Sequence, residues 1–168
     1  MSKILISACL LGQKVRYDGG DCLQNHERLQ EWIKAGKVVT ICPEMLGGLP
    51  TPRSPAEIQG SKTGIAVLNG DAHINTNTGE NVTDQFIEGA RKTLVLAQKH
   101  HVRVAILKAK SPSCGSSVIY DGSFSRSLIP GMGVTATLLN QHDILVFDEE
   151  NIDEALDAAE ALNAKASS

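Results

Sequence analysis

Three cysteines in this sequence occupy similar local settings, and thiolates are well suited to binding soft metals. Cys9, Cys42 and Cys114 each follow a short apolar, β-branched run and lie next to or near a glycine or proline. In an open parallel sheet, ligands bind in the crevice beyond the carboxyl ends of the strands. A lone cysteine is usually only a small buried hydrophobe. Three cysteines in the same setting favour a shared iron or zinc site.

Cys22 is the remaining cysteine, and it lies in a polar loop beside Asp21. A closed tetrahedral zinc site could use all four cysteines. However, structural zinc sites usually take their ligands in closely spaced pairs, and here successive cysteines are 13, 20 and 72 residues apart. Three ligands and one open metal position are what a catalytic cluster needs. We therefore leave Cys22 outside the ligand set, with no predicted role.

Polar residues near these cysteines are candidates for proton transfer and hydrogen bonding. Glu44 is two residues after Cys42, so its carboxylate could act in the same crevice, although an ordinary solvated glutamate is the alternative. Ser111 and Ser113 precede Cys114, and either hydroxyl could contact a bound group or only stabilise the turn. Either serine is therefore a candidate catalytic residue.

Basic residues at the same predicted edge could hold an anionic or polar ligand. Lys108 and Lys110 close an apolar run, and Arg53 lies in a proline-rich and glycine-rich segment. Solvated surface charge is the alternative reading for all of them. No histidine pair has metal-ligand spacing, and the glycines at 115, 131 and 133 do not form a dinucleotide fingerprint.

Composition narrows the class of ligand. The chain has 168 residues, a formal net charge of -3, and only 4% aromatic residues. Nucleic-acid domains usually carry a basic excess and stacking aromatics, so a small molecule is the expected partner. The apolar run at 4–6 is too short for a signal peptide or a membrane span, so we expect a cytoplasmic protein with reduced thiols. The sequence does not indicate an oligomeric state.

Strand and helix patterns alternate along the chain. They predict one α/β domain over 1–168, with an open, mainly parallel, Rossmann-like sheet covered by helices on both faces. The expected strands cover 3–8, 37–41, 102–107 and 143–147, and the expected helices cover 25–35, 84–100, 132–141 and 151–163. Asn25 and Thr83 are the expected helix caps. Residues 64–68 are predicted as a strand, with a hairpin excursion near 73–75.

Several motifs together resemble the family of thiouracil desulfidases, long catalogued as a domain of unknown function. They are the ISACLLG segment at 6–12, YDG at 17–19, CPE at 42–44, GGLPTPR at 47–53 and SPSCG at 111–115. The resemblance runs from about residue 3 to residue 147. It implies a cytoplasmic enzyme that converts a thiolated uracil such as 4-thiouracil to uracil and hydrosulfide, with no net redox change.

The resemblance also implies a cofactor and residue roles. A 4Fe-4S cluster is expected on Cys9, Cys42 and Cys114, with one iron open to the substrate sulfur, and Glu44 is expected to move protons. Ser111 and Ser113 remain joint candidates, and Asp18, Arg53, Lys108 and Lys110 are candidate substrate-binding residues. The alternatives are a cluster-dependent sulfur carrier or lyase, and a non-catalytic zinc or iron–sulfur sensor protein.

Overall fold

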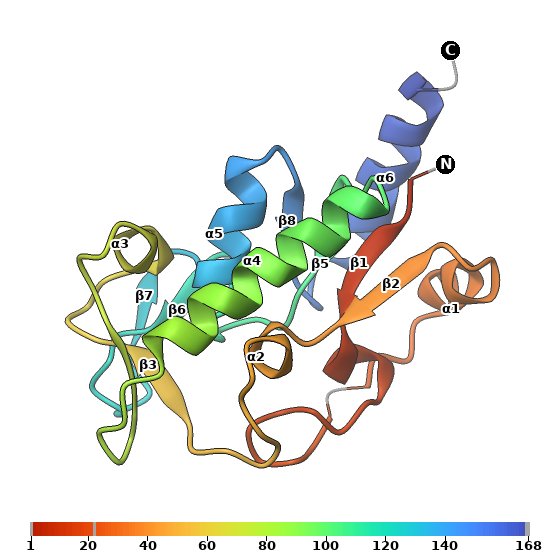
Figure 1. Ribbon diagram of the computed structural model, residues 1–168. Helices are drawn as coiled ribbons and strands as arrows, with labels where there is room; N and C mark the ends of the chain where they lie inside the picture. The colour runs from red at the N-terminus through yellow and green to blue at the C-terminus, as the bar shows by residue number, and fades with distance from the viewer. Residues whose placement is uncertain (1, 22, 167–168) are drawn as a thin grey trace.

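The computed structural model describes residues 2–21 and 23–166, and a parallel sheet forms its centre (Figure 1). Four strands lie in the order β2-β1-β5-β8. Their bounds are Ile4–Ser7 for β1, Val38–Ile41 for β2, Val104–Ile106 for β5 and Leu145–Phe147 for β8. Each strand falls within a segment that the sequence pattern predicts as a strand.

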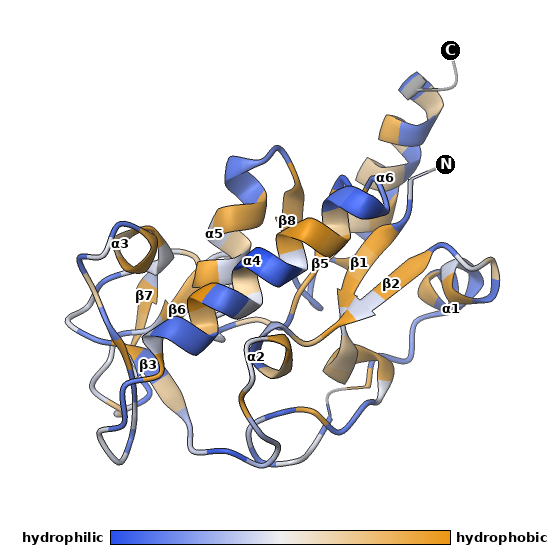
Figure 2. Cartoon of the chain, in the orientation of Figure 1, coloured by the Kyte–Doolittle hydropathy of each residue, from blue (hydrophilic) through white to orange (hydrophobic). Residues whose placement is uncertain are grey.

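Helices cover both faces of this sheet because successive side chains of a strand point to opposite faces. On β1, Ile4 and Ile6 pack with α1 (Glu27–Lys34) and α6 (Ile152–Ala166). Leu5 packs on the other side with α4 (Thr83–Lys99) and α5 (Val134–Gln141). Figure 2 shows β1 and β2 as hydrophobic, whereas the loops beyond their ends are of mixed hydropathy.

Shorter elements surround the carboxyl edge of the sheet. The 3-10 helix η1 (Ala8–Leu11) follows β1, and the one-turn helix α2 (Pro43–Leu46) follows β2. Two antiparallel pairs add to this region: β3 (Ala56–Ile58) with β4 (Ile74–Thr76), and β6 (Val118–Tyr120) with β7 (Leu128–Pro130). Within the described ranges, no helix is long and apolar enough to cross a bilayer.

The structure corrects three local predictions. Residues 64–68 form a helix, α3 (Gly64–Leu68), because a short apolar run fits either a strand or a buried helix, and β4 pairs with β3 instead. The side chain of His26, not Asn25, caps α1 by accepting the amide of Leu29. Thr83 is already helical, and its hydroxyl instead donates to Asn81 and accepts from the Ile74 amide.

Helix α2 packs directly on α4 through backbone-to-backbone contact. A β-carbon added at Gly89 would overlap the carbonyl oxygen of Pro43, and one added at Gly47 would overlap that of Gln85. Only glycine permits this approach, since any side chain would have to enter space that a backbone carbonyl already fills. The contact fixes α2, and with it Cys42 and Glu44, against the long helix.

We therefore expect Gly89→Ala to destabilise the fold. Alanine normally stabilises a helix relative to glycine by about 0.4–1 kcal/mol, but here the clash with Pro43 should reverse the sign and cost about 1–3 kcal/mol. Chemical denaturation would measure the free energy of unfolding. The matched control is Arg91→Ala, at an exposed position of the same helix, which should stay within about 0.5 kcal/mol of the parent. A stabilised Gly89→Ala protein would contradict the close packing.

Candidate active site

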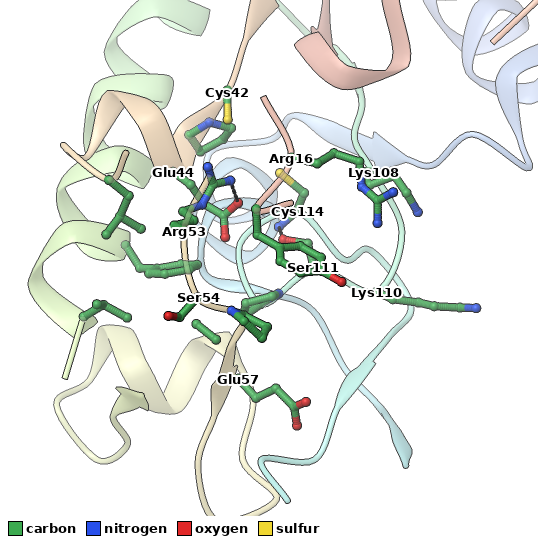
Figure 3. Close-up of a pocket in the computed structure, with 18 of the residues that line it drawn as sticks. Arg16, Cys42, Glu44, Arg53, Ser54, Glu57, Lys108, Lys110, Ser111 and Cys114 are labelled. Atoms are coloured by element: carbon green, nitrogen blue, oxygen red, sulfur yellow. Dashed lines mark hydrogen bonds and ion pairs between the residues drawn. The ribbon is translucent and has the colours of Figure 1, made fainter. Parts of the chain in front are cut away.

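Three strand ends bring the three predicted cysteines to one cavity. Cys9 lies in η1 directly after β1, Cys42 directly follows β2, and Cys114 lies in the turn region after β5. All three line one cavity of ≈ 670 Å³ at the carboxyl edge of the sheet (Figure 3). That volume falls within the usual range of small-molecule sites, about 300–1,000 Å³.

The register of the sheet aligns the ends of the strands that precede these cysteines. In the parallel ladder, Ser7 pairs with Ile41, and Ile6 pairs with Ile106. Strands β1, β2 and β5 therefore end at nearly the same level, and the chain after each strand enters the same crevice. This is the location at which open α/β sheets bind ligands.

The Cys42 thiol is held at the start of α2. Its sulfur lies 3.9 Å from the carbonyl oxygen of Val15, to which the thiol donates. Burial raises the pKa of Cys42, the nearby Glu44 charge adds to the increase, and the Met45 amide and Arg53 guanidinium oppose it. The net direction is upward, so the isolated thiol stays protonated at neutral pH.

The Cys114 thiol is fully buried and close to other acidic groups. Burial raises its pKa well above the ordinary value. The charges of Glu44, Cys42 and Cys9 raise it further, so the three thiols are near enough to repel one another when ionised. A cation bound among them would relieve this repulsion and favour the thiolates.

Ser7 supports Cys114 from the end of β1, and the motif analysis did not select it. Its buried hydroxyl donates to the Cys114 sulfur over 3.8 Å, and it accepts the Lys108 amide over 3.0 Å. This hydrogen bond lowers the pKa of Cys114, against the other contributions. Ser7 lies in the 6–12 motif, two residues before Cys9, and this position is the signal in the sequence that could have indicated it.

Glu44 lies in the cavity wall beside Arg53. The guanidinium Nη2 of Arg53 donates to Glu44 Oε2 over 2.5 Å, as Figure 3 shows. Arg53 also donates to Thr51 Oγ1 and to the carbonyl oxygens of Val15 and Pro50, each over 3.1 Å. Arg53 also lines the cavity, and its side chain is only 7% exposed, so these bonds hold Glu44 and the loop in one orientation.

The two serine candidates occupy different environments. Ser111 lines the cavity, and its Oγ accepts the amides of Ser113 and Cys114 over 3.0 and 3.1 Å. Ser113 is 1% exposed and is not among the lining residues, and its hydroxyl pairs with Thr135 Oγ1 over 2.7 Å. The structure thus brings Ser111, and not Ser113, into the site.

The other predicted site residues also differ in whether they line the cavity. Lys108 lines the cavity, but its ammonium forms an ion pair of 2.7 Å with Glu149. Lys110 lines the cavity and is exposed, with no ion pair to any described residue. Asp18 is not a lining residue, and its carboxylate instead accepts the amide of Gly20 in a local turn. Cys22 lies outside the described residues, so the prediction about it remains a prediction.

A second side of the cavity was missed by the motif analysis. It includes Glu57 on β3 together with Tyr120, Phe124 and Arg126 from the β6–β7 hairpin. The sequence pattern predicts a short strand at 118–120 and a turn at 121–122, and β6 confirms that strand. Residues 128–130 have no strong strand pattern, so its partner strand β7 was not predicted. Arg16 completes the wall, with its guanidinium 5.8 Å from the Tyr17 ring centroid.

These features define a class of protein: an open-sheet α/β protein whose ligand cavity combines three thiols, an oriented carboxylate and several cationic side chains. The donor set is all sulfur, which suits iron–sulfur chemistry. Among the described residues, no three His, Cys, Asp or Glu side chains are close enough to hold a single metal ion. The three thiols line the cavity from the ends of three different strands.

Comparisons with known proteins agree with this class. A sequence model of the 2-thiouracil desulfurase family matches residues 4–151. The uncharacterized protein YbbK of Bacillus subtilis (strain 168) is 47% identical over 153 residues, covering 91% of this chain and 99% of YbbK. The solved structure of TudS, a 4Fe-4S-dependent thiouracil desulfidase, matches with a TM-score of 0.87 and 42% identity, covering 96% of this chain and 99% of TudS.

The chain therefore belongs to the 2-thiouracil desulfurase family, and it is an enzyme that cleaves a carbon–sulfur bond of a thiouracil. The resemblance inferred from the motifs is confirmed, as is the open, mainly parallel α/β fold. The ligand set and the roles of individual residues remain predictions, and they are argued below.

The raised pKa values predict how the thiols react with an alkylating agent. In metal-free, reduced protein at pH 8, iodoacetamide should modify Cys42 more slowly than free glutathione, since only thiolates react and a raised pKa lowers their fraction. Cys114, which is deeper and more strongly shifted, should react more slowly still, and both rates should rise with pH. Peptide mass spectrometry would measure each rate. Modification of Cys114 before Cys42 would contradict the electrostatic account.

Proposed function

We propose that this enzyme is a 4Fe-4S-dependent desulfidase that converts a 4-thiouracil-like base to uracil and releases hydrosulfide. The observation that carries the proposal is the arrangement of Cys9, Cys42 and Cys114 around one cavity that also contains Glu44. The similarity to TudS, a 4Fe-4S-dependent thiouracil desulfidase, supports the cofactor assignment. Overall, water replaces sulfur on the ring carbon, so the reaction is hydrolytic and needs no electron donor.

In this proposal Cys9, Cys42 and Cys114 hold the cluster, and one iron has no protein ligand. Burial, and then the charges of Glu44, Cys42 and Cys9, raise the pKa of Cys114, so a positively charged group between the thiols would favour their ionised form. When bound, the cluster supplies an electrophilic, sulfur-binding iron that polarises the thiocarbonyl group. The protein side chains then need only orient the base and move protons.

Glu44 is the residue that we assign to proton transfer. Arg53 binds Oε2, whereas Oε1 has no hydrogen-bond partner within the part of the chain that the structure describes. That oxygen can accept a proton from the water that adds to the ring carbon. As the carbon–sulfur bond breaks, Glu44 returns this proton to sulfur, which leaves as hydrosulfide, and the hydroxyl group of the adduct loses its own proton to solvent to become the carbonyl of uracil. Arg53 keeps the carboxylate in one orientation throughout this exchange.

Ser111 is the serine that we propose to assist. Its Oγ accepts two backbone amides, so its own proton must be directed elsewhere. Donation toward an oxygen or sulfur atom of the substrate in the cavity would orient the ring. Ser113 is not proposed for this role, because its hydroxyl is paired with Thr135 in the protein interior.

The size of the cavity and the net charge of the chain favour a small substrate over a nucleic acid. Its volume of ≈ 670 Å³ accommodates a thiolated pyrimidine, and the chain as a whole carries a formal charge of -3. Lys110, Arg16 and Arg126 line the cavity without an ion pair to any described residue, and so they remain available to polar groups of the substrate. We place the enzyme in the cytoplasm, where thiols stay reduced.

The test of this function is conversion of 4-thiouracil by anaerobically purified protein. Glu44→Gln should keep its iron and sulfide but lose turnover by about 10²- to 10⁴-fold, because the amide preserves the shape without accepting a proton. Loss of absorbance of 4-thiouracil would give the rate, and chromatography would identify uracil. The matched control is Glu154→Gln, an exposed carboxylate on α6, which should turn over at the rate of the parent.

Two outcomes would contradict the proposal. Near-normal turnover by Glu44→Gln with full iron content would remove Glu44 from the chemistry. Transfer of sulfur to an added acceptor, without hydrosulfide release, would indicate a sulfur carrier instead of a hydrolytic desulfidase.

A further inference from the structure

We propose that Glu57 is a positioning residue that holds the hairpin loop at 121–127 so that Phe124 forms an aromatic wall for the substrate ring. This inference deepens the proposed function and rests on it. Glu57 is a buried carboxylate on β3, 9% exposed, and no step of the chemistry above uses it. Figure 3 shows Glu57 at the end of the cavity away from Cys42.

Glu57 joins the loop through its carboxylate. The Oε1 atom accepts the backbone amide of Gly122 over 3.0 Å and that of Phe124 over 3.2 Å. A buried carboxylate is retained at low cost only where it is hydrogen-bonded, and a charged acceptor makes stronger bonds than a neutral one. These two bonds tie the loop to β3, on the side opposite the thiols.

Two further contacts fix the loop to the same segment. A β-carbon at Gly122 would lie 2.5 Å from the carbonyl oxygen of Ile58, so only glycine fits this approach, and Gly122 also has a positive φ of 99°. The amide of Ser61 donates to the Asp121 carbonyl oxygen over 2.9 Å. The loop is therefore anchored along residues 57–61.

The strained residues of the loop are the ones that face the cavity. Phe124 and Arg126 have positive φ values of 57° and 63°, which side chains larger than glycine rarely adopt, and both line the cavity. Ser123, Ser125 and Ser127 are exposed and are not lining residues. Strain of this kind persists only where surrounding contacts impose it, and it is frequent at ligand sites. For Phe124, the Glu57 carboxylate supplies one such contact directly, through the amide of that residue.

This geometry gives Phe124 a role in recognition. The ring is half-buried and lines a cavity that has to accommodate a flat pyrimidine. An aromatic ring at this position stacks on, or contacts edge to face, the ring of the base. Loss of the Glu57 bonds would release the loop and misplace Phe124, without removing any residue from the chemistry around Glu44.

The test uses steady-state kinetics of the anaerobic, cluster-containing enzyme with 4-thiouracil. Base–aromatic contacts are worth roughly 5- to 150-fold in affinity, so Glu57→Ala and Phe124→Leu should each raise KM within that range and change kcat much less. Iron and sulfide content should not change. Glu57→Gln, which keeps an acceptor oxygen for the two amides, should recover most of the loss. Glu154→Ala, which removes an exposed carboxylate on α6 outside the cavity, is the matched control.

A double variant and hydrogen exchange complete the test. If Glu57 acts through Phe124, the combined Glu57→Ala and Phe124→Leu protein should have a KM close to that of Phe124→Leu alone. The amides of Gly122 and Phe124 should exchange faster in Glu57→Ala and return toward the parent rate in Glu57→Gln.

Three results would overturn the inference while leaving the function intact: an unchanged KM in Glu57→Ala, a Glu57→Gln protein as impaired as Glu57→Ala, or fully additive effects in the double variant. A parent holoenzyme that leaves 4-thiouracil unchanged would instead contradict the proposed function, and this inference with it.

Discussion

The parallel register of β1 with its two neighbours is the constraint on which the rest of this site depends. Ser7 lies level with Ile41, and Ile6 lies level with Ile106, so three strands end together. Residues far apart in the sequence, such as Cys9 and Cys114, consequently line the same cavity. A parallel sheet can be held in this way only when both faces are covered, and the helices supply that cover.

Electrostatics make it costly to ionise all three thiols in the isolated chain. Burial and the charges of neighbouring groups raise the pKa of Cys114, so folding alone does not favour three adjacent thiolates. Arg53 partly compensates, since it binds Glu44 and lowers the pKa of Cys42. In the proposed mechanism the ion pair thus serves two purposes: it fixes Glu44 for proton transfer and reduces the negative charge beside the proposed ligands. The positive charge of a bound cluster would offset the repulsion that remains among the ionised thiols.

Sequence patterns predicted the framework better than the cavity wall. The β1 segment and the strand before Cys42 were recognisable because they are short apolar runs, rich in β-branched residues and bounded by turn residues. Residues 64–68 were assigned wrongly because such a run also fits a short helix. The choice between Ser111 and Ser113 depended on which hydroxyl Thr135 would bind, which is a tertiary contact. The contact between Glu57 and the loop that carries Phe124 depends on how β6 pairs with β7. No local sequence motif encodes that pairing.

Metal and sulfide analysis of cysteine variants purified without oxygen tests the central claim most directly, namely that Cys9, Cys42 and Cys114 are the only protein ligands of a 4Fe-4S cluster. The parent chain should contain about four iron and four acid-labile sulfide per molecule. Serine at any one of the three positions should abolish both, together with the iron–sulfur absorbance and turnover. Cys22→Ser should retain all of them. Zinc in place of iron, or a colourless and inactive Cys22→Ser protein, would contradict the account.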